Sequence, residues 1–369
     1  MEEEIRLVEE ERIYVASQWK LMWWKFRKHK MAMISVGVLL VFYLIAIFAE
    51  FVAPYDPHKY DVRYVLAPPQ RIHFFDETGF HFRPFVYGYK LELDPNTLRR
   101  IYIVDKTKKY PIYFFTEGPE YKLLGIFKTN IHLFGVREGH IFLFGTDSMG
   151  RDLFSRIVYG TRVSTTVGLV GVFISFILGI IIGGISGYFG GVIDLIIQRV
   201  IEVLRSVPTL PLWMALSAAL PPHWDPVKVY FGITIILSLI GWTGLARDVR
   251  SKFLSLREED FVTAARLAGS SEIRIILRHL VPSFLSHIIA SLTLAIPNMI
   301  IGETSLSFLG LGIRPPAISW GVLIQDAQNI RTVALSPWLL IPFIFVVIVV
   351  LAFNFVGDGM RDAADPYAK

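Results

Sequence analysis

The sequence contains no cysteine among its 369 residues. A chain without cysteine has no disulfide framework, no thiol nucleophile and no thiolate metal ligand. It also lacks a G-x-x-x-x-G-K-[ST] loop, the motif that cradles nucleotide phosphates. The histidines His73, His81, His132 and His140 do not have the spacing of metal ligands. We therefore expect neither thiol chemistry nor a metal centre, and any nucleotide hydrolysis must come from another chain.

Charged residues are also scarce. The chain is 19% charged and 53% hydrophobic, whereas a soluble domain is about 25% charged and about 45–50% apolar. The apolar residues come in long runs, and the basic residues behind the net charge of +5 cluster beside those runs. Such clusters are typical of cytoplasmic loops of membrane proteins. We therefore expect a multi-pass protein in a lipid bilayer, with no nucleic-acid partner.

Six segments are long and apolar enough to span a membrane as a helix, which requires about 20 residues. They are Met31–Ala53, Val163–Tyr188, Ile196–Leu220, Val229–Ala246, Phe284–Ile301 and Pro337–Phe355. The first run has no A-x-A-like exit, so we expect a retained anchor and not a signal peptide. The third run carries Arg199, Glu202 and Arg205, although charges inside a span are costly. The prediction is an all-α membrane protein with six transmembrane helices.

Basic residues in the short flanks of the spans predict the orientation, because such residues stay in the cytoplasm. They precede the first span (Lys20, Lys25, Arg27, Lys28, Lys30) and fill the connection between the fourth and fifth spans (Arg247, Arg250, Lys252, Arg257, Arg266, Arg274, Arg278). An even number of crossings separates these two segments, so the assignments agree. We expect both termini in the cytoplasm, at the cytoplasmic (inner) membrane of a prokaryote.

This topology divides the chain into regions. They are a cytoplasmic segment at 1–30, a first transmembrane helix at 31–53, an extracytoplasmic region at 54–162, a five-helix core at 163–356 with a cytoplasmic loop at 247–282, and a cytoplasmic tail at 357–369. Within the extracytoplasmic region, aromatic and β-branched runs such as 101–104 and 112–115 are broken by proline and glycine. This pattern predicts a small β-rich insert over about 70–145. Its aromatic residues at 74–115 are expected to pack in a core, and stacking on a ligand is the alternative.

Two further patterns predict packing. Gly179, Gly183 and Gly187 recur every four residues in the second span, a spacing that favours close helix packing in lipid. The stretch 147–152 precedes that span and is interpreted as a helix-start motif. Glu303 lies at the outer end of the fifth span; it is a candidate gate of a path, while solvation or local hydrogen bonding is the alternative.

The loop between the fourth and fifth spans has the pattern of two short helices. Gly269 can take a positive φ and end the first helix, and Ser271 can cap a second helix that precedes Pro282. Acidic residues suit the start of the first helix, where they complement its dipole: Glu258, Glu259 and Asp260. Its apolar residues at i, i+3, i+4 and i+7 form a stripe of mostly small side chains: Phe261, Ala264, Ala265 and Ala268. Such a stripe would let a partner approach closely.

This loop resembles the signature of ATP-binding-cassette (ABC) importer permeases: Glu-Ala-Ala, three residues, Gly, nine residues, then Ile-x-Leu-Pro. The matching residues are Ala264, Ala265, Gly269 and Pro282. Thr263 stands where the family most often has Glu, and His279 and Val281 replace Ile and Leu. These departures are of the sort that the peptide-permease branch tolerates.

Further motifs resemble the oligopeptide/dipeptide branch, in its C-type partner subunit. They are Gly145–Asp152, Ser305–Gly312, Trp320-Gly321 and Phe353–Asp362. Together they cover nearly all of 145–365. The insert is longer than usual for this subunit, and in this the chain resembles the longer permeases of the peptide and microcin-C type.

The resemblance implies a type I ABC importer permease fold and half of a translocation path for peptides or similar small solutes. It implies four kinds of partner: a homologous permease subunit, two ATP-binding subunits, an extracytoplasmic substrate-binding protein and the bilayer. The chain itself would hold no catalytic residue and no cofactor, with ATP and Mg bound by the ATPase subunits. The implied ATPase-coupling residues are Glu258, Glu259, Asp260, Phe261, Ala264, Ala265, Arg266, Gly269 and Pro282.

Alternatives remain at this stage. Within the same transporter class, the cargo could be oligosaccharides or another solute. An ion-coupled secondary transporter would require ionisable residues or broken helices near the membrane centre, which the third run alone hints at. An intramembrane enzyme would require a nucleophile–base or metal constellation on the spans, and the sequence has none.

The topology is testable with single cysteines, because the native chain has none. An impermeant thiol reagent should label Lys108→Cys in intact cells or spheroplasts, since the insert is expected outside. It should not label Lys252→Cys, which is expected in the cytoplasm. The reverse labelling pattern would overturn the orientation.

Overall fold

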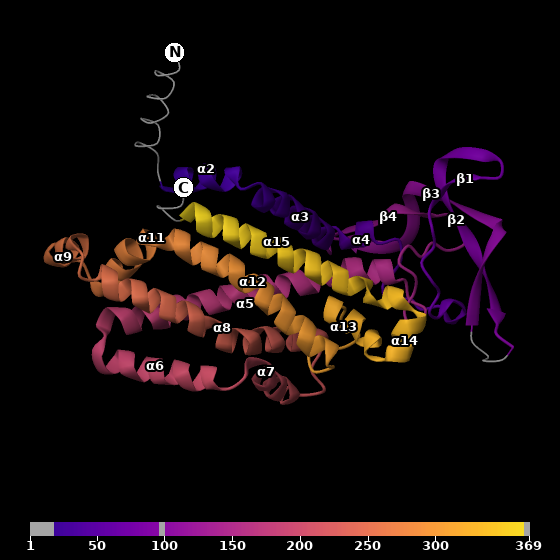
Figure 1. Ribbon diagram of the computed structural model, residues 1–369. Coiled ribbons are helices and arrows are strands. Elements are labelled where there is room, and N and C mark those ends of the chain that lie inside the picture. Colours follow the sequence, from indigo (N-terminus) through magenta and orange to yellow (C-terminus); the bar gives the residue numbers. More distant parts are fainter. Residues whose placement is uncertain (1–17, 96–99, 365–369) are drawn as a thin grey trace, which may run out of the picture.

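The structure is a computed structural model that describes residues 18–95 and 100–364. Residues 1–17 and 365–369, which belong to the predicted cytoplasmic ends, lie outside the described residues. The helices form an elongated bundle with a small sheet at one end (Figure 1).

The α-helices are α2 Gln18–Lys28, α3 Lys30–Ile47, α4 Ala49–Val52, α5 Leu153–Phe189, α6 Gly191–Ser206, α7 Thr209–Ala218, α8 Pro226–Leu256, α9 Asp260–Leu267, α10 Glu272–Ile275, α11 Val281–Ser283, α12 Leu285–Phe308, α13 Trp320–Ile324, α14 Ile330–Leu335 and α15 Ile341–Ala364. Shorter helical turns lie at Val62–Tyr64, Ile276–Leu280, Gln325–Gln328 and Pro337–Leu340.

Five helices of the described chain are long and apolar enough to cross a membrane: α3, α5, α8, α12 and α15 with its preceding turn. A sixth crossing is possible where α6 and α7 follow one another, but these two helices meet at 86°. Figure 1 shows α7 turning away from the line of α6. The count is therefore five straight spans, or six with the bent pair.

The prediction of one helix over Ile196–Leu220 is wrong, because the chain leaves helical geometry at Val207 and Pro208. Val207 has φ −87° and ψ 132°, and Pro208 has φ −55° and ψ 127°. Proline has no amide hydrogen, and its ring disfavours helical geometry in the residue before it. The apolar run thus becomes two short helices.

The helix-start motif at 147–152 is confirmed, because α5 begins at Leu153, directly after it and before Val163, where the predicted apolar run starts. Asp152 caps it, since its Oδ2 accepts a 2.7 Å hydrogen bond from the Ser155 amide. Asp147 organises the preceding turn, accepting hydrogen bonds from the Met149 amide at 2.8 Å and the Arg151 amide at 3.0 Å. The polar motif thereby supplies the partners that the first amides of α5 need. At the other end of the core, α15 runs to Ala364, so the helix continues into the predicted tail.

The predicted close packing of the glycines is confirmed, and the partner of α5 is α8. A Cβ atom at Gly183 would lie 2.4 Å from the carbonyl oxygen of Ala246. A Cβ at Gly179 would meet Leu245 at 2.8 Å, and one at Gly187 would meet the Arg250 carbonyl at 2.7 Å. The two backbones therefore approach as closely as only glycine permits.

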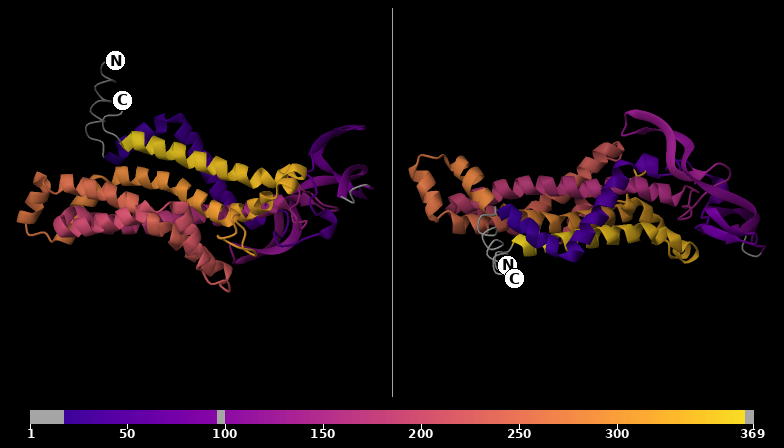
Figure 2. Two further views of the ribbon diagram at one scale, coloured as in Figure 1. Left: turned by 60° about the horizontal axis from the view of Figure 1, so that its bottom comes forward. Right: turned by 90° about the horizontal axis from the view of Figure 1, so that it is seen from above.

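The sheet occupies part of the predicted β-rich insert. Its antiparallel strands follow the order β1 His73–Asp76, β2 Gly79–Leu93, β3 Arg100–Leu123 and β4 Phe127–Val136. In the views of Figures 1 and 2 the sheet lies at one end of the bundle. Its core is small, with Val86, Ile112 and Ile141 buried together.

The prediction that the insert's aromatic residues pack in a core is wrong for many of them. Exposed aromatic side chains include Phe74, Phe75, Phe80, Phe82, Phe114 and Phe115. A four-stranded meander that extends well past its small core leaves most of its strand faces open. The insert therefore leaves several aromatic side chains open among its polar residues.

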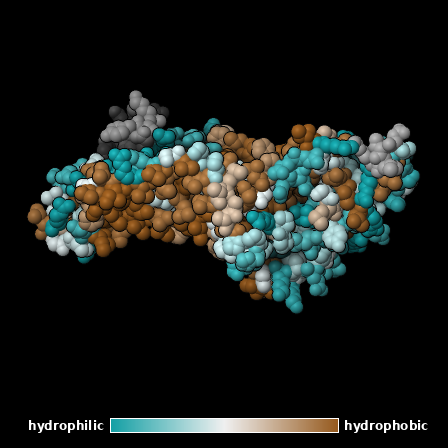
Figure 3. Space-filling model, turned by 90° about the horizontal axis from the view of Figure 1, so that it is seen from below, coloured by the Kyte–Doolittle hydropathy of each residue, from teal (hydrophilic) through white to brown (hydrophobic). Residues whose placement is uncertain are grey.

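The two ends of the molecule differ in composition. Figure 1 shows α2, α9 and α11 at the end opposite the sheet. Figure 3 shows hydrophobic residues gathered over the helical bundle and hydrophilic residues over much of the sheet end. This distribution is that of a membrane bundle with polar extremities.

The α5–α8 contact can be tested by a matched pair of substitutions. Gly183→Ala should lower the melting temperature of the purified protein, because overpacking costs about 1–3 kcal/mol. Gly37→Ala on α3 is the control, since a Cβ at Gly37 has nothing within 4 Å. Equal melting temperatures for the two variants would contradict the close contact.

Candidate functional site

The segment between α8 and α12 forms a compact projection, here called the knob (residues 260–283). It consists of α9, α10, a π-helical turn at Ile276–Leu280 and α11. Glu259 is the N-cap residue of α9 and Asp260 its first residue, so carboxylates lie at the helix start as the sequence predicted. Ser271 is the N-cap residue of α10, but its side chain makes no capping hydrogen bond. Pro282 lies in the first turn of α11, where proline is tolerated.

Gly269 ends α9 through its backbone. Its φ is +78°, and its amide donates to the Arg266 carbonyl at 3.0 Å. The Ser270 amide donates to the Ala265 carbonyl at 3.1 Å. These two hydrogen bonds make a Schellman motif, which glycine favours because it has no Cβ. A Cβ at Gly269 would meet nothing within 4 Å. Glycine is therefore favoured here because of the positive φ, and not because a larger side chain would clash with its neighbours.

The knob is fixed to the bundle by Val262, a residue that the predicted stripe did not include. Val262 is fully buried and clusters with Phe253 of α8 and with Ile275 and Leu280 of the knob. Ala265, one turn on, packs partly against the same cluster. The sequence could have revealed this buried face of α9, because Val262 and Ala265 are three residues apart and therefore lie on the same side of the helix.

Away from this cluster, the knob exposes several apolar side chains among charged and polar ones. Leu267 is 85% exposed, and Ile273 and Leu277 are also exposed. Phe261, Ala264 and Ala268 of the predicted stripe lie on the exposed side as well. We call these exposed residues the knob surface: Phe261, Ala264, Leu267, Ala268, Ile273 and Leu277. An apolar surface of this kind marks a contact site.

Arginines connect the knob and α8 to the neighbouring helices. The Arg257 guanidinium lies 3.4 Å from the carbonyl oxygens of Gly187 and Tyr188. Arg266 of α9 donates to the Tyr188 hydroxyl at 3.4 Å. Arg250 forms a bidentate ion pair with Asp194 of α6. The ends of α5, α6 and α8 are thereby held together directly behind the knob.

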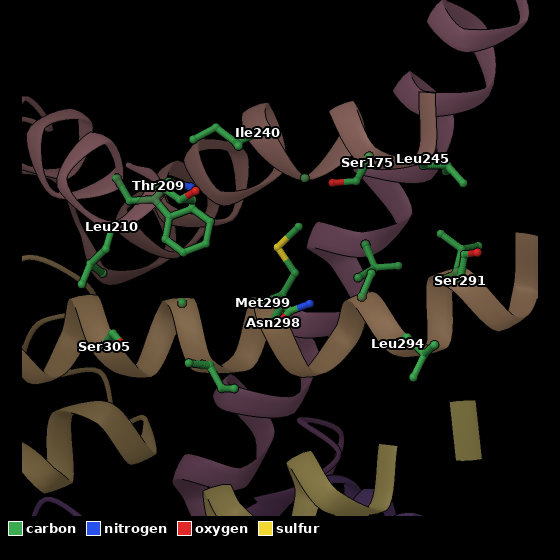
Figure 4. Close-up of a pocket in the computed structure, with 18 of the residues that line it drawn as sticks. Ser175, Thr209, Leu210, Ile240, Leu245, Ser291, Leu294, Asn298, Met299 and Ser305 are labelled. Atoms are coloured by element: carbon green, nitrogen blue, oxygen red, sulfur yellow. The ribbon is translucent and has the colours of Figure 1, made fainter. Parts of the chain in front are cut away.

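A cavity of about 740 Å³ lies inside the bundle between α5, α7, α8 and α12. Figure 4 shows Met299 and Asn298 on α12, with Ser175 and Ile240 across the space. The lining is mainly apolar, with scattered polar side chains: Ser175, Thr209, Ser291, Asn298 and Ser305. Asp248 is the one ionisable residue among the described residues that line it.

Glu303 lies apart from this cavity lining. Its side chain is fully buried, so it is not solvated at the helix end. Ser307 donates to Glu303 Oε1 at 2.7 Å, and Ser164 of α5 donates to Oε2 at 3.4 Å. The hydroxyls supply the polar partners that a buried carboxyl group requires. Glu303 thus joins the C-terminal part of α12 to the N-terminal part of α5.

The chain is similar to known transport proteins. Residues 176–369 match the family described as binding-protein-dependent transport system inner membrane component, and residues 17–69 match the N-terminal TM domain of oligopeptide transport permease C. Over 230 residues the chain is 43% identical to the oligopeptide transport system permease protein OppC of Haemophilus influenzae, covering 62% of this chain and 71% of that protein. It is 40% identical over 225 residues to the dipeptide transport system permease protein DppC of Bacillus subtilis, covering 60% and 68%. A structure of the MetNI methionine ABC transporter in inward-facing conformations aligns with a TM-score of 0.44 and 18% identity, over 57% of this chain and 96% of that chain.

The attachment of the knob is testable at one residue. Val262→Ala removes buried methyl groups and should cost about 2 kcal/mol of local stability. The amides of α9 should then exchange hydrogen faster in a mass-spectrometric measurement. Phe261→Ala alters an exposed neighbour and should leave that exchange nearly unchanged. If both variants exchange alike, Val262 does not fix the knob.

Proposed function

Because this chain belongs to the family of inner membrane components of binding-protein-dependent transport systems, we propose that it forms half of a path for peptides through the cytoplasmic membrane. It is the permease subunit of an ABC importer and not the catalyst. Family membership removes the ion-coupled transporter and the intramembrane enzyme as alternatives. Peptides are the proposed cargo because relatives are oligopeptide and dipeptide permeases; oligosaccharides or another small solute are the alternative.

The cavity between α5, α7, α8 and α12 is the proposed half-path. Its mixed lining supports this assignment, because Ser175, Thr209 and Asn298 offer hydrogen bonds that suit a peptide backbone without fixing a sequence. A homologous permease subunit would close the open side. Specificity would then lie largely in a substrate-binding protein that delivers the cargo.

The knob is the proposed docking element for the ATP-binding subunits, which would hold ATP and Mg. The observation that carries this proposal is the knob surface, in which Leu267, Ile273 and Leu277 are large apolar side chains open to contact. The proposed coupling residues remain Glu258, Glu259, Asp260, Phe261, Ala264, Ala265, Arg266, Gly269 and Pro282.

The arginine contacts offer a route by which motion of the knob reaches the path. Arg257 and Arg266 connect the knob region to the end of α5, and α5 and α8 both line the cavity. Movement of the ATPases would therefore shift two walls of the cavity together, as a rigid unit. Buried Glu303, which joins α5 to α12, is proposed to hold the outer part of the path closed and not to contact cargo.

The proposed orientation has six crossings, counting the bent pair α6–α7 as one. The basic helix α2 and the knob would face the cytoplasm together, and the sheet would face outward. The common end of α2 and α9 in Figure 1 is consistent with this orientation. The sheet would then stand where a substrate-binding protein must land.

Two substitutions at Gly269 test the coupling role. Gly269→Val should abolish ATP-driven uptake by the assembled transporter in proteoliposomes, because a β-branched residue resists positive φ at a cost of about 1–2 kcal/mol or more. Gly269→Asn is the matched control and should retain uptake, since asparagine tolerates this conformation. ATP hydrolysis and membrane insertion are measured in parallel. Wild-type uptake by the valine variant would refute the docking role of the knob.

A further inference from the structure

The hairpin formed by β3 and β4 ends in an apolar tip, defined here as residues 122–128. Its large side chains are open: Leu124 is 51% exposed, Ile126 74% and Phe127 64%. Lys122 and Lys128 flank them on the two strands, opposite one another in the register. A contiguous exposed apolar group between two lysines is unusual for a surface in water.

The turn itself is built at a conformational cost. Leu124 and Gly125 have φ of +53° and +74°, and the Ile126 amide donates to the Leu123 carbonyl at 3.1 Å. Turns with two positive φ angles favour Asn-Gly or Asp-Gly. A leucine in the left-handed region costs about 1 kcal/mol or more relative to those residues. The sequence thus retains an apolar side chain at a position where a polar one would fold more easily.

The hairpin doubles back along the bundle. Figure 2, right, shows it curling from the sheet toward the helices. Its root is held on α4 and the residue after it, because His132 Nδ1 lies 2.6 Å from the Ala53 carbonyl oxygen and the Phe115 ring lies 6.1 Å from the Phe51 ring at a tilt of 34°. The tip therefore points back toward the membrane-spanning helices, away from the free end of the sheet.

The tip reaches the outer ends of two spans. A hollow of about 470 Å³ lies between the tip and these two spans. It is lined by Lys122, Leu124 and Gly125 of the tip and by Tyr43, Ala46, Ile47, Glu50, Arg162 and Thr166 of the spans and their flanks. Arg162 and Glu50 form an ion pair at 2.8 Å, and such a pair on apolar helices belongs at the headgroup level. Thr166 lies about one helical turn deeper than Arg162, and Tyr43 lies about two turns deeper than Glu50. The tip is thus at the boundary between headgroups and acyl chains.

The surface of α3 beside the tip indicates which kind of molecule contacts the tip. On α3, the residues Leu40, Val41, Leu44 and Ile47 are exposed, and they form part of a helix apolar enough to span the membrane. The apolar tip continues this lipid-facing surface at its outer edge. Lysines beside a buried apolar group can extend toward lipid phosphates.

We propose that the β3–β4 hairpin tip is a membrane-interface anchor, with Leu124, Ile126 and Phe127 inserted in the outer leaflet and Lys122 and Lys128 at the phosphates. The partner is the lipid bilayer. This anchor would hold the sheet at a fixed height above the path. It does not depend on what the path carries.

Lipid contact is measured with one cysteine. The assembled transporter carrying Ile126→Cys, labelled with a polarity-sensitive fluorophore, is placed in nanodiscs with lipids brominated at known depths. The emission of the label should shift to the blue. Lipids brominated about 5–10 Å below the headgroup boundary should quench it. The control is Phe82→Cys, because Phe82 is 94% exposed on the neighbouring strand β2. Its label should respond to aqueous iodide and not to brominated lipid.

Other outcomes overturn the proposal and name the true occupant. If the Ile126→Cys label is quenched by iodide and not by brominated lipid, the tip lies in water. Shielding from iodide in nanodiscs without quenching by brominated lipid would indicate the partner permease, and shielding that appears only on adding the substrate-binding protein would indicate that protein. Because this experiment measures depth, it can fail while ATP-driven uptake, the test of the proposed function, still succeeds.

A second variant separates lipid contact from hairpin folding. Leu124→Asn should ease the turn and keep the hairpin formed, while removing an apolar group from the leaflet. Brominated lipids should then quench the Ile126→Cys label less than in the parent. A label at unchanged depth would mean that lipid contact does not hold the tip, and would overturn the proposal.

Discussion

Close backbone contact between α5 and α8 is the constraint on which the rest of the structure depends. In lipid, apolar surfaces gain little from association, so helices are held by packing and by interhelical hydrogen bonds. Gly179, Gly183 and Gly187 permit that packing over the C-terminal half of α5. Further out, the Ser238 hydroxyl donates to the Gly171 carbonyl at 3.0 Å and continues the contact. The two helices therefore behave as one rigid unit.

This unit connects the parts of the molecule that are proposed to act together. The end near the knob holds it through Val262 and Arg257, and the middle of the unit lines the cavity. At the end near the sheet, Arg162 of α5 reaches Glu50 and the hollow beneath the hairpin tip. The knob and the hairpin tip are thus connected by one pair of packed helices.

The sequence predicts well the features that depend on local chemistry. Gly269, the glycines of α5 and the polar start at 147–152 each satisfy a backbone demand that a few neighbouring residues reveal. Features that depend on how much surface is available for burial were missed. The phenylalanines of the insert stand in strand-like patterns. No pattern in the sequence indicates, however, that the core of the sheet is too small to bury them. The buried state of Glu303 depends partly on Ser164 of α5, which is distant in sequence, and not only on Ser307 one turn along the same helix. The break at Val207-Pro208 was readable, because a proline inside an apolar run is a helix-ending signal, yet hydropathy alone concealed it.

The bend between α6 and α7 has a consequence for biogenesis. With 16 and 10 residues, each helix is shorter than the roughly 20 residues that an independent span requires. Asp194, Arg199, Glu202 and Arg205 add charge to the first of them. Neither half therefore partitions into the bilayer by itself. The Arg250–Asp194 pair and the packing of α7 against α8 offer the missing stabilisation, so we expect this segment to enter the bilayer as a sixth crossing only after α8 has been synthesised.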